Sequence, residues 1–196
     1  MAQPKYAEPM EAERPPKVVR VGMTADEYFA GPETMQPHNL IDGRLYRSET
    51  PTPRHQELVG DLAVALYHYR EGHGGYVILS PSDCRLDDVN VLQPDLGYVI
   101  AARRRLVDRY MHRAPDLIIE VLSPGTRRFD RQQKLAVYAR NGVREAWLVD
   151  PDAETVTVFS GNGSEWTGER SVLFGDAIPS DVVDIGSGNL VREEAE

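Results

Sequence analysis

Cysteine, clustered histidine and long apolar runs are all scarce in this chain, and each absence excludes a class of protein. Cys84 is the single cysteine, so the chain can form neither an internal disulfide nor a thiolate zinc site. The five histidines are scattered without metal-ligand spacing. No apolar run approaches the ~20 residues of a membrane-spanning helix, and residues 1–20 lack the apolar core of a secretory signal. We expect a protein of the reducing cytoplasm with no membrane partner.

Sequence signatures of other function classes are missing as well. The chain has no glycine-rich phosphate loop, no nucleophile elbow and no zinc-binding pattern. A helix-turn-helix or zinc finger that would read DNA bases is also absent from the sequence. These absences leave little support for an enzyme of one of those classes.

Composition and charge describe a globular chain with an uneven charge distribution. Of 196 residues, 41% are apolar and 27% are charged, which is typical of one folded domain with a substantial core. The formal net charge of -9 argues against a protein that coats nucleic acid. Residues 103–144, however, hold eleven basic and four acidic side chains, a local charge of +7. Such a segment can face a phosphate backbone, or it can form only a solvated helix face.

Local turn and capping chemistry predicts the elements that precede the central region. Thr24 and Glu27 form a capping-box pattern, which predicts a short helix that ends at Gly31. Asp42 and Gly43 supply the positive φ angles of a tight hairpin turn. Between residues 53 and 69 apolar side chains recur at helical spacing, and the glycines at 72, 74 and 75 end this predicted helix.

The stretch 93–150 organises the chain, because it alternates apolar runs with polar loops. Apolar runs flanked by Pro and Gly indicate strands buried on both faces of a sheet. Strands are predicted at 76–79, 83–86, 96–100, 116–122, 145–150, 155–159 and 165–167, with a helix around residues 130–140. This order describes a single α/β or α+β domain over residues 21–186, between a flexible tail at 1–20 and a polar tail at 187–196.

Two acids in this stretch need an explanation, because a buried carboxylate is costly unless its charge is neutralised. Asp95 stands at the start of one predicted strand, and Glu120 shares a strand face with apolar neighbours. Two carboxylates that converge at a sheet edge form an oxygen-only site, which suits Mg²⁺ or Mn²⁺. The alternatives are that Asp95 caps a turn and that Glu120 pairs with an arginine such as Arg127 or Arg140.

Lys134 follows Asp130 by one helical turn. One interpretation is an ordinary i,i+4 ion pair on the helix surface, worth ~0.3–0.5 kcal/mol. The other aims the ammonium group at the two acids, where it would orient a water or stabilise charge on a phosphate. Spacing alone favours the surface ion pair.

Several short motifs, taken together in their order and spacing, resemble the Uma2 family within the PD-(D/E)XK restriction-endonuclease-like superfamily. The resemblance covers roughly residues 41–183. The matching motifs are Leu40-Ile41-Asp42-Gly43, Pro53-Arg54-His55-Gln56, Gln93-Pro94-Asp95, Ala114-Pro115-Asp116-Leu117, Glu120-Val121-Leu122-Ser123-Pro124, Asp130, Lys134, Tyr138, Gly142-Val143 and Trp147-Leu148-Val149-Asp150-Pro151.

This resemblance implies a restriction-endonuclease-like mixed central sheet flanked by helices, with extra β-hairpins. It makes Asp95 and Glu120 the two acids of the superfamily motif, which bind a divalent metal together with the backbone carbonyl of the intervening residue, here Val121. The lysine expected two residues after the second acid is Leu122 in this chain. In members with a displaced lysine the following helix supplies it, and Lys134 is the matching candidate.

The function that the resemblance implies is a Mg²⁺- or Mn²⁺-dependent endonuclease that hydrolyses DNA phosphodiester bonds, with Asp95, Glu120 and Lys134 as catalytic residues. The alternative is a catalytically degenerate fold that binds nucleic acid or serves in protein assembly. A homodimer is compatible with both, because related folds often dimerise. Phosphate contacts, which position DNA without reading its sequence, are expected from Arg103, Arg104, Arg127, Arg128 and Arg131.

Overall fold

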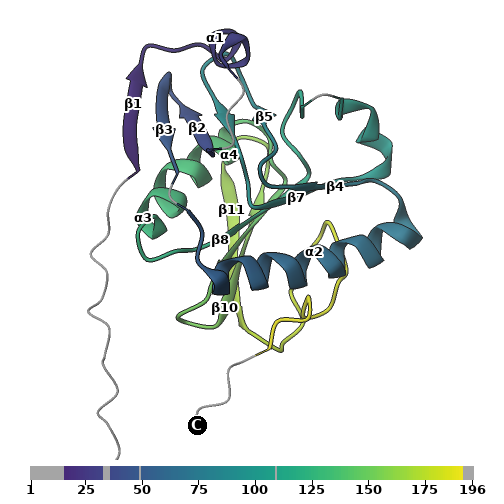
Figure 1. Ribbon diagram of the computed structural model, residues 1–196. Coiled ribbons are helices and arrows are strands. Elements are labelled where there is room, and N and C mark those ends of the chain that lie inside the picture. The colour runs from purple at the N-terminus through teal and green to yellow at the C-terminus, as the bar shows by residue number, and fades with distance from the viewer. Residues whose placement is uncertain (1–15, 33–35, 49, 109, 192–196) are drawn as a thin grey trace, which may run out of the picture.

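The computed structural model describes residues 16–32, 36–48, 50–108 and 110–191. Within this part of the chain, helices and two β-sheets form a mixed α+β fold, as the sequence predicts (Figure 1). One sheet has six strands and the other has five. The two sheets have different roles, since the larger carries the core and the smaller closes one side of the candidate site.

The six-stranded sheet has the order β11-β10-β9-β8-β7-β4. All neighbours are antiparallel except β8 and β9, which are parallel and are joined by a helical crossover. The strands are β4 (Tyr76–Leu79), β7 (Leu96–Val99), β8 (Leu117–Val121), β9 (Glu145–Asp150), β10 (Thr155–Gly161) and β11 (Trp166–Leu173). The crossover contains α3 (Arg127–Phe129), a π-helical turn (Asp130–Lys134) and α4 (Leu135–Arg140).

Apolar side chains cover the central strands of this sheet from both sides, which explains their unbroken apolar runs. On one side α2 (Pro53–His73) buries Leu58, Leu62 and Leu66 in a cluster with Leu117 and Ile119 of β8. On the other side the crossover packs against alternate residues of β8 and β9. Full burial of one leucine stabilises the fold by about 1.5–3 kcal/mol. Among the described residues, no helix has both the length and the apolar character that are needed to cross a membrane.

The five-stranded sheet has the order β1-β3-β2-β6-β5. Its strands are β1 (Lys17–Val21), β3 (Arg44–Arg47), β2 (His38–Ile41), β6 (Val91–Leu92) and β5 (Cys84–Arg85). The predicted hairpin joins β2 to β3, with φ of 47° at Asp42 and 71° at Gly43. The predicted capping box is also confirmed, because Thr24 and Glu27 cap each other's backbone at the start of α1 (Ala25–Ala30).

The structure corrects the predicted boundaries of the folded part at both ends. Lys17 to Arg20 do not belong to a tail, because they pair with β3 as part of strand β1. Leu190, placed by the sequence in the polar tail, is 1% exposed and packs into the main core. The remaining tail positions, 1–15 and 192–196, lie outside the described residues.

The helix predicted for residues 53–69 also extends further, to His73. Gly72 lies within the helix, and Gly74, with a φ of 71°, ends it by donating its backbone N–H to the carbonyl of Arg70. The basic segment after β7 begins with a 3₁₀ helix, Ala101–Leu106.

Candidate active site

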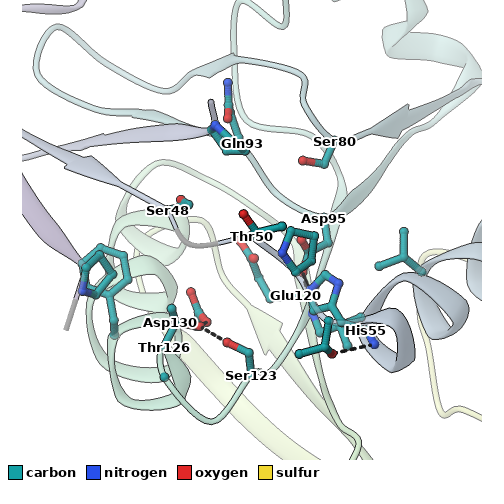
Figure 2. Close-up of a pocket in the computed structure, with 18 of the residues that line it drawn as sticks. Ser48, Thr50, His55, Ser80, Gln93, Asp95, Glu120, Ser123, Thr126 and Asp130 are labelled. Carbon is teal, nitrogen blue, oxygen red and sulfur yellow. Dashed lines mark hydrogen bonds and ion pairs between the residues drawn. The ribbon is translucent and has the colours of Figure 1, made fainter. Parts of the chain in front are cut away.

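Sheet register brings Asp95 and Glu120 to the same place. Leu96 of β7 lies opposite Ile119 of β8 in an antiparallel pair, so the next residues along, Asp95 and Glu120, are neighbours across the two strands. Both acids line a cavity of about 390 Å³. Figure 2 shows the acids at the centre of this cavity, with His55 on one side and Asp130 on the other. The two acids predicted from the sequence therefore face one space.

Asp95 is held by two hydrogen-bond donors on a single carboxylate oxygen. The backbone N–H of Val121 donates to Oδ2 at 2.8 Å, and His55 Nε2 lies 3.1 Å from the same atom. His55 comes from the first turn of α2, where the Thr52 hydroxyl accepts the backbone N–H of His55 and so caps the helix. Burial lowers the pKa of the His55 ring, but the hydrogen bond and charge of Asp95 outweigh it, so this pKa is raised overall.

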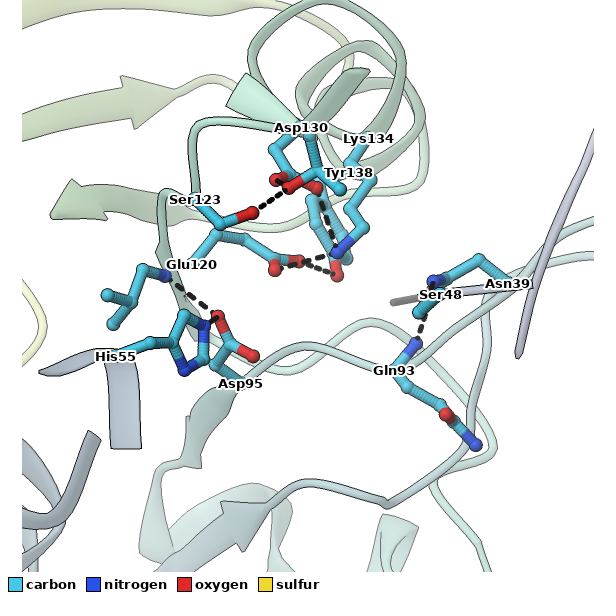
Figure 3. Close-up of polar contacts among 12 residues, drawn as sticks. Asn39, Ser48, His55, Gln93, Asp95, Glu120, Ser123, Asp130, Lys134 and Tyr138 are labelled. Carbon is cyan, nitrogen blue, oxygen red and sulfur yellow. Dashed lines mark hydrogen bonds and ion pairs between the residues drawn. The ribbon is translucent and has the colours of Figure 1, made fainter. Parts of the chain in front are cut away.

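Glu120 has a partner on each carboxylate oxygen, although its side chain is only 2% exposed. Lys134 Nζ lies 2.8 Å from Oε2, and the Tyr138 hydroxyl donates to Oε1 at 2.7 Å (Figure 3). Burial raises the pKa of Glu120 to about 8; Lys134 opposes this rise, and the charges of Asp95 and Asp130 add to it. Burial therefore favours the protonated form of Glu120, and the Lys134 ammonium group favours its carboxylate form.

Pairing of Glu120 with an arginine is ruled out by the positions of the two candidates. The Arg127 guanidinium binds the carboxylates of Asp150 and Asp152. Arg140 binds Asp42, at the hairpin turn of the five-stranded sheet.

Lys134 forms the predicted ion pair with Asp130, but this pair is buried and is shared with Glu120. Its Nζ is 3.1 Å from Asp130 Oδ1, and the Lys134 side chain is 10% exposed. Burial lowers the pKa of Lys134, yet the surrounding carboxylates of Asp130, Glu120 and Asp95 raise it well above its usual value. The interpretation as a surface i,i+4 pair is therefore wrong. Lys134 ends a π-helical turn, a distortion that is frequent at functional sites.

Leu122 occupies the position where the superfamily pattern expects a lysine, and it is 2% exposed. It belongs to the core cluster beneath the crossover, together with Leu135 and Tyr138. A lysine at this position would bury its charge among apolar side chains. The crossover supplies Lys134 to the second acid instead.

The five arginines expected to contact phosphate do not line the cavity. Two of them neutralise carboxylates that are largely buried, because Arg103 binds Asp116 at 2.9 Å and Arg127 binds Asp150 as well as the exposed Asp152. The other three keep more exposed contacts: Arg104 with the Tyr76 ring, Arg128 with Gln132, and Arg131 with Glu169. The local charge of +7 overstated the free positive charge, since a sequence count cannot see such pairs.

The donor set of the site fits a magnesium-type ion. Within the described ranges, no group of three or more His, Cys, Asp and Glu side chains is placed to hold a metal. Mg²⁺ does not need such a group, because it commonly binds through one or two carboxylates and completes its shell with water and phosphate oxygens. Asp95 and Glu120 supply two carboxylates at one cavity, so the residues present fit the ion.

Two residues of the site were quoted in matching motifs but received no role from the sequence. His55 contacts Asp95, and Tyr138 contacts Glu120. A usable signal existed for both. His55 shares a helix face with the buried Leu58 and Leu62, where a histidine is unexpected, and Tyr138 lies one turn beyond Lys134.

The fold and the paired acids define a restriction-endonuclease-like protein. A crystal structure titled "putative nuclease belonging to DUF820", from Anabaena variabilis, is similar with a TM-score of 0.71 at 21% identity, covering 86% of this chain and 94% of the other. In sequence, the chain is 26% identical over 131 residues to "Uncharacterized protein slr1290" of Synechocystis, covering 65% of this chain and 67% of that protein. The family model for Uma2, described as "Putative restriction endonuclease", matches residues 25–187. The chain therefore belongs to the Uma2 family, as its motifs indicated.

Proposed function

We propose that this protein is a divalent-metal-dependent endonuclease that hydrolyses phosphodiester bonds in DNA. The observation that carries the proposal is the position of Asp95 and Glu120, which come from neighbouring strands and line one cavity. Membership of the Uma2 family, described as "Putative restriction endonuclease", supports the same reaction class.

The carboxylates of Asp95 and Glu120, with the backbone carbonyl of Val121, are the groups that would hold Mg²⁺ or Mn²⁺. When bound, such an ion polarises a phosphate and lowers the pKa of an attacking water. The chain's own contribution is preorganisation. His55 and the Val121 N–H fix one acid, and Tyr138 fixes the other.

Lys134 supplies the one cation among the described side chains that line the cavity, apart from His55 if its ring is protonated. Its ammonium group is held in place by two carboxylates and needs little reorganisation. A fixed cation of this kind stabilises negative charge that develops on a phosphate in the transition state. We assign Lys134 this role, together with the control of charge on Glu120.

Contacts with the DNA backbone outside the cavity can come from the arginines that remain exposed. Arg104, Arg128 and Arg131 lie at the surface, and none of them holds a buried carboxylate. Arg103 and Arg127 are already engaged with acids, so we give them a structural role.

One observation favours the alternative of a non-enzymatic nucleic-acid-binding or assembly module. Both oxygens of Glu120 are occupied, by Lys134 and by Tyr138, so an ion must compete with an existing buried pair. In a degenerate site this pair would simply replace the metal.

Cleavage of plasmid DNA with and without Mg²⁺ or Mn²⁺ decides between the two functions. Glu120→Gln is the control, because it keeps the size of the side chain and removes its charge. The nuclease predicts metal-dependent cleavage that Glu120→Gln abolishes. If the wild-type protein neither cleaves DNA nor binds Mn²⁺ in a calorimetric titration, the module is the correct assignment.

A further inference from the structure

Two cationic side chains and a histidine form a row across one end of the five-stranded sheet. In the antiparallel pairing, Arg47 of β3 lies opposite Lys17 of β1 on one side and His38 of β2 on the other. Directly opposite residues project from the same face of a sheet. Since neighbouring strands are about 4.8 Å apart, the three residues span about 10 Å. We call Lys17, Arg47 and His38 the cationic row.

The two charges of this row have no acidic partner in the part of the chain that the structure describes. Arg20, on the same strand as Lys17, binds Glu27 at 2.8 Å, whereas Lys17 and Arg47 are exposed and form no such pair there. His38 uses Nδ1–H to donate to the carbonyl of Gln36 at 2.7 Å. Like charges directly opposite each other destabilise a strand pair, so the row is a place where an anion would be stabilising.

This end of the sheet borders the candidate active site. Each member of the row is the chain neighbour of a residue that lines the cavity, namely Pro16, Pro37 or Ser48. Tyr46 packs on Phe129 with ring centroids 4.9 Å apart, which holds the end of β3 against the crossover. In Figure 1 the start of β1 and the end of β3 lie beside α3. By strand alternation the row projects from the face of the sheet opposite Tyr46, at the end of the sheet where the residues next to it in the chain line the cavity.

We propose that the cationic row holds backbone phosphates of a DNA strand whose scissile bond lies in the cavity. The inference rests on the proposed function and names the surface that positions its substrate. Lys17 offers a point charge, and Arg47 offers a planar fork that matches two phosphate oxygens. Contacts of this kind fix the position of DNA without reading its sequence. This surface could not be predicted from the sequence, because its residues come together only through strand pairing.

Salt-dependent binding of the full-length protein tests the proposal. The probe is a fluorescent DNA duplex of about 20 base pairs, measured by anisotropy without added metal so that no cleavage occurs. The test variant is Lys17→Gln/Arg47→Gln. The control is Arg44→Gln/Arg105→Gln, which removes the same charge from two exposed arginines, one of them at the other end of β3. Loss of two phosphate contacts should make the negative slope of log K for DNA binding against log salt concentration shallower by about 1.8. The control should keep the wild-type slope.

Two outcomes would overturn the proposal. If the test variant keeps the wild-type slope, the row does not touch phosphate. If both variants lose slope equally, overall charge accounts for the effect. The nuclease itself is tested apart from the row, by Mn²⁺-dependent hydrolysis of bis(p-nitrophenyl) phosphate by the wild-type protein and Glu120→Gln. Absence of that hydrolysis would refute the proposed reaction, while the salt slopes would still decide whether the row binds DNA.

Discussion

Replacement of Lys134 by methionine should destabilise the protein severely, although the residue is a lysine on a helix. The change keeps the length of the side chain and removes the charge that lies between Glu120 and Asp130. All three side chains are at most 10% exposed, so solvent cannot take over the role of the ammonium group. Removal of one partner from a buried pair typically costs about 3–5 kcal/mol. For a chain of this size the melting temperature should fall by about 6–20 °C.

Urea and thermal unfolding at two pH values would measure this effect. Glu120 has a folded-state pKa raised to about 8, above the usual 4.5, so its contribution destabilises the fold increasingly as pH rises between these values. Without Lys134 that pKa rises further. The cost of Lys134→Met should therefore be smaller near pH 5, where a proton neutralises Glu120 in both folded proteins, and should grow as pH rises through about 8, where Glu120 loses that proton first in the wild-type protein. Arg131→Gln, which breaks only an exposed pair with Glu169, should cost at most about 1 kcal/mol.

A cost below about 1 kcal/mol for Lys134→Met at about pH 9, above the folded-state pKa of Glu120, would refute the reasoning from burial. Mn²⁺ gives a second and independent check. An ion held by the acids would take over the neutralising role of the lysine, so Mn²⁺ should stabilise Lys134→Met more than the wild-type protein. A free Mn²⁺ concentration of 100 times the dissociation constant would raise the free energy of unfolding by about 2.7 kcal/mol. An equal Mn²⁺ shift in both proteins would mean that Lys134 and the ion do not compete for Glu120.

Three further substitutions separate positioning from packing. His55→Ala should weaken Mn²⁺ binding about 10–100-fold, since partners of metal ligands commonly contribute this much to metal affinity. His55→Asn should recover part of the lost affinity. Equal Mn²⁺ titration curves for His55→Ala and the wild-type protein would contradict a role of His55 in orienting Asp95. Tyr138→Phe should cost about 1.5–3 kcal/mol in urea unfolding at pH 8, because it removes a hydrogen bond to a buried acid; a neutral result would show that Glu120 is protonated or otherwise satisfied. Leu190→Ala should cost about 2–5 kcal/mol, and a change below 0.5 kcal/mol, on the order of a surface substitution, would return this residue to a tail.

The parts of the fold that could be predicted are those set by local chemistry. The turn at Asp42 and Gly43 and the capping box at Thr24 and Glu27 depend on residues within four positions of one another. Strand β1 could not be found this way, because its five residues are all exposed and only their hydrogen bonds to β3 make them a strand. Leu190 is a single apolar residue in a polar stretch, and its burial depends on a distant core.

The same division explains what the sequence revealed of the candidate site. Asp95 and Glu120 could be identified, because an acid in an apolar run is conspicuous and the family motif marks both. The burial of Lys134 could not, because it depends on the π-helical turn that directs the side chain toward β8. The carboxylate partners of Arg103 and Arg127 could not be anticipated for a related reason, since these acids are 13 and 23 positions away in the chain.

The parallel crossover between β8 and β9 also has a kinetic consequence. Glu120 lies 14 positions from Lys134 and 18 from Tyr138, whereas Asp95 lies 40 from its partner His55. Short sequence separation favours early contact formation during folding. We therefore expect the charged half of the site to assemble with the crossover, and the half that contains Asp95 to wait until α2 docks on the sheet. Backbone amides at the start of α2 should then exchange their hydrogens with solvent through local openings that cost less free energy than those of β8. The site would therefore loosen first on the His55 side.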